Sequence, residues 1–388
     1  MSKTAEVADL ALSLKEKGHK VINMASGELT FRPASTVRKK ACQIINKGQT
    51  LYTQVAGLNE LRQLLSDKLK KDLEVDYKSD EIIVSNGGKQ VIYNALQSTI
   101  NRGDEVIIVS PYWVSYPEII KLCGGKPKIL QSKRKDGFSI NTKNLEKLIT
   151  SKTKWLILNS PNNPTGTVYS FETLKNLTEL LKKYPEIWVL SDDIYEKLNF
   201  SSKKNVNIIN LDKRLKERSL IVNGFSKGYC MTGWRLGYGA GPKILIEAMK
   251  KIQSQSTSAP NTIAQNAAIE ALKLDNNYFE EIKTSLIKRR AVVTSAFSDF
   301  QSFSSNFSQG AFYIFPSIKR FLGKRLNGRD IIVDDTSFCL HLLSSEYVAV
   351  VPGSSFGSKD SIRISYALSE KDLRIGCKRI KRFCKKLV

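Results

Sequence analysis

The sequence predicts an α/β protein whose sheet is mostly parallel and is sandwiched between helices. Short, nearly continuous apolar runs alternate with longer amphipathic segments through the middle of the 388-residue chain. Such runs are typical of strands that are buried on both faces, as parallel strands are. With 41% hydrophobic residues, a chain of this length can bury two separate cores. We therefore expect a large domain and a smaller α/β domain.

The elements expected before the sheet are helices and one short strand. The helices cover residues 5–17, 35–46 and 59–73. Gly18 ends the first helix, and the strand 21–24 leads into a turn-rich loop. The loop 51–57 has no local pattern that explains it.

Strands and helices alternate through the central part of the chain. Strands are expected at residues 81–84, 105–109, 128–130, 155–158, 187–190 and 220–222. Helices are expected at residues 88–100, 116–123, 141–149 and 171–183. Polar or reactive side chains follow several strands, among them Asp192 and Lys227. Because α/β sheets bind ligands at the carboxyl ends of their strands, these side chains are predicted to share one site.

The last third of the chain adds helices and three short strand-like runs. Helices are expected at residues 243–253, 262–273 and from 277 onward, and strands at residues 310–315, 348–351 and 362–366. This pattern predicts a smaller unit that the N-terminal segment completes. We expect a large domain at residues 35–275 and a small domain formed by residues 1–34 and 276–388.

The net charge of +24 has two interpretations. A basic surface could bind nucleic acid or an anionic membrane. Most of the charge, however, is lysine spread along amphipathic segments, with no interleaved aromatic residues and no recognition motif. We favour a lysine-biased composition that attracts anionic ligands, and we expect no nucleic-acid partner and no membrane partner. No apolar run approaches the ~18 residues of a membrane span and no signal-peptide profile is present, so we expect a cytoplasmic protein.

The cysteine and histidine content limits the chemistry. The six cysteines include no Cys-x-x-Cys pair, which argues against a disulfide framework and a zinc site. The two histidines, His19 and His341, lie in no motif. We expect no metal ion, and a lysine remains the best candidate for an acid or base.

Lys227 is that candidate, because it follows a buried-strand pattern and precedes Arg235 by eight residues. Desolvation and a nearby cation lower the pKa of an amine and make it nucleophilic, which suggests a carbonyl cofactor that carries a phosphate. Upstream, Gly88 and Lys89 open a helix whose backbone N–H groups can bind an anion. The alternatives are two surface cations and an ordinary glycine turn.

Motifs in a fixed order identify a family. They are Gly-Gly-Lys-Gln at 87–90, Pro-Tyr-Trp-Val-Ser-Tyr-Pro at 111–117, Asn-Ser-Pro-Asn-Asn-Pro-Thr-Gly at 159–166, Ser-Asp-Asp-Ile-Tyr-Glu at 191–196, Ser-Lys at 226–227, Met-Thr-Gly-Trp-Arg-Leu-Gly-Tyr at 231–238 and Arg-Ile-Ser-Tyr-Ala at 363–367. The sequence resembles the class I pyridoxal-phosphate aminotransferases, and most of all their prokaryotic aspartate aminotransferase subgroup. The resemblance covers nearly the whole chain and implies fold type I of the pyridoxal-phosphate-dependent enzymes, with a large domain that binds the cofactor.

The resemblance implies cofactor contacts for five residues. Lys227 is expected to bond to the aldehyde of pyridoxal 5′-phosphate (PLP) and, once released by substrate, to shuttle a proton. Asp192 is expected to pair with the pyridine nitrogen and keep it protonated. Tyr195 and Asn163 are expected to hydrogen-bond the ring oxygen, and Trp113 to stack on the ring.

The phosphate and the substrate have their own expected contacts. Those of the phosphate are the backbone at Gly88 and Lys89, Ser226, Arg235 and, from the neighbouring subunit of a homodimer, Tyr52. The last contact would explain the loop 51–57. The α-carboxylate of the substrate is expected at Arg363, with Gly27, Trp113 and Asn163 completing the contact. The side chain of Lys89 is our candidate for a second carboxylate, the alternative being that it points to solvent.

Two departures from the family pattern concern the substrate. The family's common Gly-Glu-Pro-Asp-Phe is here Gly-Glu-Leu-Thr-Phe at residues 27–31. In the family this loop closes over the substrate, so the change leaves substrate specificity and loop closure open. The chain also begins close to Ser2-Lys3-Thr4, which resembles the family's Ser-Pro-Thr, so part of the substrate lid or dimer clasp is expected to be absent.

The first functional hypothesis is an aspartate aminotransferase that passes the amino group to 2-oxoglutarate in two half-reactions. The second is an aromatic-amino-acid or prephenate aminotransferase, or a PLP-dependent lyase, because fold does not fix the reaction. The third is a basic, non-catalytic binding protein on the same scaffold. Absorption spectra before and after addition of L-aspartate would separate these hypotheses.

Overall fold

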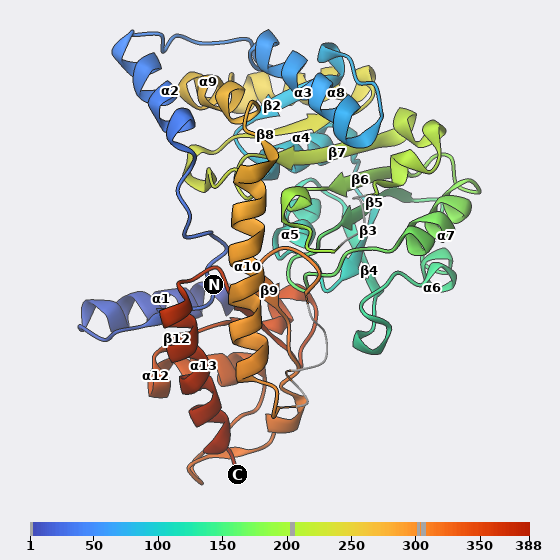
Figure 1. The fold of residues 1–388 in the computed structure, drawn as a ribbon. Helices are drawn as coiled ribbons and strands as arrows, with labels where there is room; N and C mark the ends of the chain where they lie inside the picture. The colour runs from blue at the N-terminus through green and yellow to red at the C-terminus, as the bar shows by residue number, and fades with distance from the viewer. Residues whose placement is uncertain (1–2, 202–205, 301–302, 304–307) are drawn as a thin grey trace.

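The computed structural model describes residues 3–201, 206–300, 303 and 308–388, but not the side chains of residues 3–6 and 8. One large sheet dominates the fold (Figure 1). Within these residues the sheet has seven strands in the order β2-β8-β7-β6-β5-β3-β4. They are β2 (Ile82–Ser85), β3 (Glu105–Ser110), β4 (Lys126–Gln131), β5 (Thr153–Asn159), β6 (Trp188–Asp192), β7 (Ser219–Gly224) and β8 (Gly237–Ala240). Only β8 runs antiparallel to its neighbours. The prediction of a mostly parallel sheet is confirmed.

Helices cover both faces of this sheet (Figure 1). Those of one face are α2 (Ser35–Asn46), α3 (Asn59–Leu73), α6 (Thr142–Glu146), α7 (Phe171–Leu181) and α9 (Thr262–Ala271), and those of the other are α4 (Gly88–Thr99), α5 (Ser115–Leu122) and α8 (Lys243–Ser256). Successive side chains of a strand point to opposite faces, so each strand serves two cores. In β5, Leu156 and Leu158 enter the first core, and Trp155 and Ile157 enter the second.

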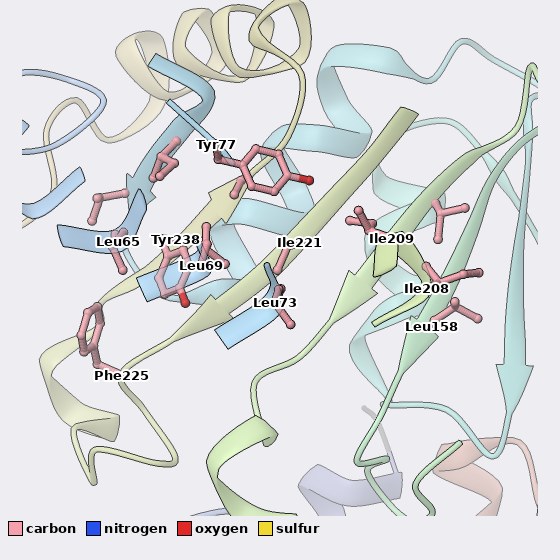
Figure 2. Close-up of a cluster of buried hydrophobic side chains, with 14 of the residues drawn as sticks. Leu65, Leu69, Leu73, Tyr77, Leu158, Ile208, Ile209, Ile221, Phe225 and Tyr238 are labelled. Atoms are coloured by element: carbon pink, nitrogen blue, oxygen red, sulfur yellow. The ribbon is translucent and has the colours of Figure 1, made fainter. Parts of the chain in front are cut away.

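The first core packs the apolar stripe of α3 against the sheet, as Figure 2 shows. Leu65, Leu69 and Leu73 follow one another at four-residue spacing, and they are buried in the same cluster as Ile221 of β7 and Tyr238 of β8. Residues at this spacing share one face of a helix. The sequence pattern thus fixes how α3 lies on the strands next to the Lys227 turn.

A second unit joins the two ends of the chain, and most of its elements lie below the sheet in Figure 1. Its helices are α1 (Lys3–Glu16), α10 (Asn276–Ala296), α12 (Asp335–Glu346) and α13 (Glu370–Lys385). Its strands are β1 (Ile22–Asn23), β9 (Tyr313–Ile314), β10 (Arg325–Leu326), β11 (Asp330–Ile331), β12 (Val348–Ala349), β13 (Val351–Pro352) and β14 (Ile362–Ser365). β1 pairs in parallel with β12, and the order β13-β14-β9 forms an antiparallel sheet.

This second unit has its own buried cluster. The cluster runs in sequence from Val7 to Leu387 and also takes in Tyr195 and Leu198 from the segment that follows β6. The segment with Tyr195 therefore lies where the two units meet. The domain boundaries at residues 35 and 275 stay a prediction.

The helices begin in two different ways. Ser170, Asp275 and Ser369 accept a backbone N–H with their side chains at the starts of α7, α10 and α13, and so cap these helices. α4 instead follows Gly87 and has no side-chain cap. Its first backbone N–H groups are thus available to a ligand.

The described part of the chain has no helix that is both long and apolar enough to cross a membrane. Nor does it gather three or more His, Cys, Asp or Glu side chains that could hold a metal ion.

Candidate active site

A cavity of about 430 Å³ lies at the carboxyl ends of β5, β6 and β7. Asn159 and Asp192, the last residues of β5 and β6, line it together with Ser226 and Lys227, which follow β7. The predicted site residues that line the cavity are Gly27, Gly88, Lys89, Trp113, Asn163, Asp192, Tyr195, Ser226, Lys227, Arg235 and Arg363. The structure thus brings together residues that are up to 336 positions apart in the chain, since Gly27 and Arg363 both line it.

Lys227 lies in this cavity with its amine near the turn-rich N-terminal loop. Its Nζ donates a hydrogen bond to the backbone oxygen of Gly27 over 2.6 Å. Burial lowers the pKa of Lys227 to about 8, and the positive charges of Arg363 and Arg235 act in the same direction. Near neutral pH, a usable fraction of this amine is therefore free base.

Asp192 ends β6 and is buried at the side of the cavity. Its Oδ2 accepts a hydrogen bond of 2.6 Å from the phenol of Tyr116, and the side chain of Asn159 donates to its backbone oxygen over 2.9 Å. Burial raises the pKa of Asp192 to about 6, although the Tyr116 hydrogen bond works against this shift. A cation next to this carboxylate would stabilise its charged form.

Sequence reasoning did not single out Tyr116 or Tyr313. Tyr116 lies within the Pro-Tyr-Trp-Val-Ser-Tyr-Pro motif and meets the ring of Trp113 edge-on, with 5.3 Å between ring centroids. The phenol of Tyr313 is 3.2 Å from that of Tyr195. Tyr116 could have been found from its motif, whereas only the fold brings Tyr313, on β9, to this place.

The residues around the start of α4 form a corner suited to an anion. Gly87 has a φ of 89°, and a Cβ at this position would lie 2.6 Å from Nη2 of Arg235. Only glycine therefore leaves the guanidinium of Arg235 this close to the start of the helix. Ser226 and Gly88 line the same cavity, so one cation, one hydroxyl group and one helix N-terminus converge there.

Lys89 follows this corner and has its side chain in the cavity. Its Nζ lies 5.0 Å from the ring centroid of Trp113. Burial lowers the pKa of Lys89, and the charge of Arg235 lowers it further. Lys89 is nevertheless an exposed residue, so both the cavity and the solvent remain open to its side chain.

Arg363, on β14, brings a buried guanidinium to the side of the cavity that the second unit forms. It donates to Oδ1 of Asn163 over 3.1 Å and to the backbone oxygen of Ala25 over 2.6 Å. Its carbon Cζ lies 4.4 Å from the ring centroid of Tyr313. Among the described residues its buried Nε has no hydrogen-bond partner. An unpaired buried N–H of this kind suits a carboxylate.

Asp193, next to Asp192, is a second carboxyl group that sequence reasoning passed over. It accepts hydrogen bonds from Ser191 and Asn207, each of 2.7 Å, and does not line the cavity. Burial raises the pKa of Asp193 to about 7, and the charge of Glu196 adds to the shift.

Tyr52 is the one predicted residue that this cavity does not include. Its side chain is 93% exposed. The neighbouring Leu51 is tied to α9 by a hydrogen bond from Thr262 to its backbone oxygen. The segment Ser2-Lys3-Thr4 lies outside the residues whose side chains are described. Thr30, from the departing loop motif, lies beside Arg289, whose Nη1 donates to its Oγ1 over 2.9 Å.

The chain matches a known family along almost its whole length. Residues 19–380 match the family described as aminotransferase class I and II. The probable aspartate/prephenate aminotransferase of Rhizobium leguminosarum bv. phaseoli is 45% identical over 383 residues, which are 99% of this chain and 96% of the relative. The aspartate/prephenate aminotransferase of Cereibacter sphaeroides is 42% identical, with the same shares covered.

Solved structures agree with the sequence relatives. The aspartate aminotransferase of Rhizobium meliloti superposes with a TM-score of 0.96 at 39% identity, covering 100% of this chain and 97% of that one. The Thermus thermophilus aspartate aminotransferase with maleate superposes with a TM-score of 0.90 at 34% identity, covering 99% and 97%. Matches of this length, together with the convergence of the predicted residues on one cavity, show that the chain belongs to the class I and II aminotransferase family.

Proposed function

We propose that this aminotransferase moves the amino group of L-aspartate to 2-oxoglutarate in two half-reactions, with PLP as its cofactor. The observation that carries the proposal is that a buried amine with a lowered pKa, Lys227, shares one cavity with the carboxylate of Asp192 and the guanidinium of Arg363. The names of the relatives, aspartate or aspartate/prephenate aminotransferase, support the same substrate.

The residues present fit PLP at three points. Asp192 offers a carboxylate to the ring nitrogen, and Lys227 offers an amine to the aldehyde. The corner formed by Arg235, Ser226 and the start of α4 offers a cation, a hydroxyl group and backbone N–H groups to the phosphate. The glycine that lets Arg235 approach the helix start is part of the same fit.

Each side chain has a separate role in the proposed reaction. When bound, PLP supplies an aldehyde that takes up an amino group and a ring that accepts electrons. Lys227 Nζ, as free base, takes the proton from Cα of the substrate and later returns one. Asp192 holds the proton on the ring nitrogen by its negative charge, and Arg363 orients the substrate through its α-carboxylate.

Tyr195, Asn163 and Trp113 complete the proposed cofactor contacts. Tyr195 would donate a hydrogen bond from its phenol to the ring oxygen of the bound cofactor. Asn163 serves the same oxygen and, through its bond with Arg363, links the cofactor to the substrate carboxylate. Trp113 lies in the cavity wall with an aromatic face for the ring.

For a second carboxylate on the substrate we propose Lys89. Its side chain lines the cavity, while its backbone lies in the first turn of α4, so one residue can serve the phosphate and the substrate. An aromatic or prephenate aminotransferase is the second candidate, because the names of several relatives include prephenate.

We further propose a homodimer in which Tyr52 reaches the phosphate in the partner's site, because its side chain is exposed and lies outside its own cavity. We propose a cytoplasmic location, the domain division at residues 35–275, and neither nucleic acid nor membrane as partner. An open groove of about 1140 Å³ between α10 and α13 is rich in lysine and arginine, but none of the described residues that line it is aromatic and could stack on a base.

The deciding experiment is spectroscopic. The purified protein is loaded with PLP, and its visible absorption is recorded before and after L-aspartate is added, and again after 2-oxoglutarate. We expect the absorption band to be lost with the first addition and restored by the second. A spectrum that L-phenylalanine changes at lower concentrations than L-aspartate would favour the second candidate, and one that no amino acid changes would contradict both.

A further inference from the structure

Four charged side chains form a cluster behind the active site, outside its cavity. Lys68 and Asp72 come from α3, and Glu196 and Lys197 come from the 3-10 turn η3 (Glu196–Leu198). Lys68 Nζ lies 2.6 Å from Glu196 Oε1 and 3.0 Å from Asp72 Oδ2. Lys197 Nζ lies 3.1 Å from the same Asp72 oxygen. The side chain of Lys68 is only 10% exposed, so this ion pair is screened little by solvent.

The cluster holds the turn that carries Tyr195. Glu196 follows Tyr195 directly, and its backbone N–H donates to the oxygen of Asp193 over 2.8 Å. Leu198 N–H donates to the oxygen of Tyr195, also over 2.8 Å. The backbone from the end of β6 through η3 is therefore one tight turn. Glu196 and Lys197 join this turn to α3 by their ion pairs with Lys68 and Asp72.

The same cluster packs against the turn that carries Lys227. A Cβ on Gly228, the next residue, would lie 2.8 Å from Cβ of Lys197. The stem of Lys197 thus occupies the space that a side chain on Gly228 would need. The cluster therefore contacts the two backbone turns that carry the side chains of Tyr195 and Lys227.

The ion pairs stabilise the charged forms of Lys68 and Asp72. Burial alone would lower the pKa of Lys68, but Glu196, the neighbouring tyrosines and Asp72 raise it well above its ordinary value. Burial would likewise raise the pKa of Asp72, but Lys68 and Lys197 lower it. Lys68 and Asp72 therefore stay charged over the pH range in which Lys227 titrates.

We propose that Lys68 is a positioning residue for the proposed PLP reaction: acting through Glu196 and Asp72, it fixes the Tyr195 and Lys227 turns relative to each other. The inference rests on the proposed function, since it assumes that PLP is held between these two side chains. It assigns no substrate contact to Lys68 itself, which does not line the cavity.

The pH midpoint of the visible absorption of the bound cofactor tests this role. A hydrogen bond from Tyr195 to the ring oxygen stabilises the deprotonated form of the cofactor and so lowers this midpoint. Tyr195→Phe is therefore expected to raise it. If Lys68 positions Tyr195, Lys68→Met raises the midpoint too, by about half a pH unit or more. Added to Tyr195→Phe, it causes a clearly smaller further rise, because the hydrogen bond is already gone.

Two variants and one stability measurement make the test decisive. Lys71→Met changes an exposed lysine of the same helix and is expected to leave the midpoint where it is. Glu196→Ala removes the ion pair between Lys68 and the Tyr195 turn but leaves the ion pair between Lys68 and Asp72. This variant is expected to raise the midpoint even if Lys68→Met does not fold. The melting temperature of each protein without cofactor reports purely structural damage. A lower melting temperature with an unchanged midpoint, in either Lys68→Met or Glu196→Ala, would overturn the proposal. A parent protein that shows no cofactor band would instead contradict the proposed function.

Discussion

The phenol of Tyr116 donates a hydrogen bond of 2.6 Å to Oδ2 of Asp192, deep in the cavity wall. This contact links the start of α5 to the end of β6, 76 positions later in the chain. Burial alone would push the carboxyl group toward its neutral form, and the phenol opposes that shift. The charge that Asp192 can offer to a ring nitrogen thus depends in part on a neighbour that touches neither cofactor nor substrate in our proposal.

Tyr116→Phe is expected to raise the pKa of Asp192 and weaken its hold on the ring proton. A hydrogen bond to a charged group contributes ~1.5–3 kcal/mol, so kcat/KM should fall about ten- to a hundredfold. Steady-state kinetics with L-aspartate measures this effect. Tyr112→Phe, a change in the neighbouring tyrosine, is the matched control. Equal losses in both variants would mean that Tyr116 acts only through packing.

Lys227→Ala is expected to remove the visible absorption of the bound cofactor and to lower kcat at least about a thousandfold, because both the covalent attachment and the acid–base group are lost. The variant should still bind PLP, since Arg235 and Asp192 remain. Absorption spectra and turnover measure the first two effects, and retention of PLP on a desalting column measures the third. Exposed Lys135→Ala serves as control. Transamination at the parental rate would remove Lys227 from its proposed role.

Lys89→Ala is expected to act selectively on dicarboxylic substrates. A charge-assisted contact of ~1.5–3 kcal/mol corresponds to about a ten- to hundredfold lower kcat/KM for aspartate, with little change for phenylalanine. Both substrates are measured in the parent and in the variant. If both values fall together, or neither falls, another residue binds the distal carboxylate. Thr30, which Arg289 holds at the N-terminal loop, would then be the next residue to test for the distal carboxylate.

Mixed dimers test the assignment of Tyr52 to the partner's site. Tyr52→Ala leaves a subunit that keeps Lys227, and Lys227→Ala leaves one that keeps Tyr52. A mixed dimer of the two therefore has one site with both residues. We expect mixing, after dissociation and reassembly, to restore up to about half of the parental activity per mixed dimer. Activity that stays at the average of the two homodimers, or an active monomer in light scattering, would contradict the assignment.

Asp193 gives the cofactor-free protein an unusual pH dependence of stability. Its pKa of about 7 and that of Asp192, about 6, both exceed the ordinary 3.8, so the folded state holds more protons than the unfolded state between these values. Stability should therefore fall as the pH rises from about 4 to about 7. In Asp193→Asn, the free energy of unfolding in urea should fall less over this range, by on the order of 1–3 kcal/mol. The same fall in both proteins would mean that Asp193 is ionised when folded.

Local sequence patterns predicted the residues at strand ends, because a buried strand followed by polar residues marks the binding edge of a parallel sheet. Asp192 and Lys227 were found in this way. The antiparallel direction of β8 was not predicted, because an apolar run does not indicate in which direction its strand runs in the sheet. Tyr313 was missed because its partner Tyr195 is 118 positions away.

Lys68 shows why charge patterns can mislead. In the sequence it is one of several lysines on an amphipathic helix, where a charged face normally meets water. In the fold, η3 packs on that face and supplies Glu196 as a counter-charge. The departure at Thr30 has a similar explanation. Its partners Arg289 and Ala367 lie 259 and 337 positions away in the chain, so its role depends on contacts that no local pattern contains.

The parallel pairing of β1 with β12 has a consequence for synthesis on the ribosome. Ile22 and Asn23 find their strand partners only at Val348 and Ala349, so the first strand to be made waits for nearly the whole chain before it can pair. Ile22 and Met24, buried in the finished protein, stay without this cover in the growing chain. A nascent chain that stalls before residue 348 would thus expose an apolar N-terminal segment to chaperones and proteases, even when its large sheet has already formed.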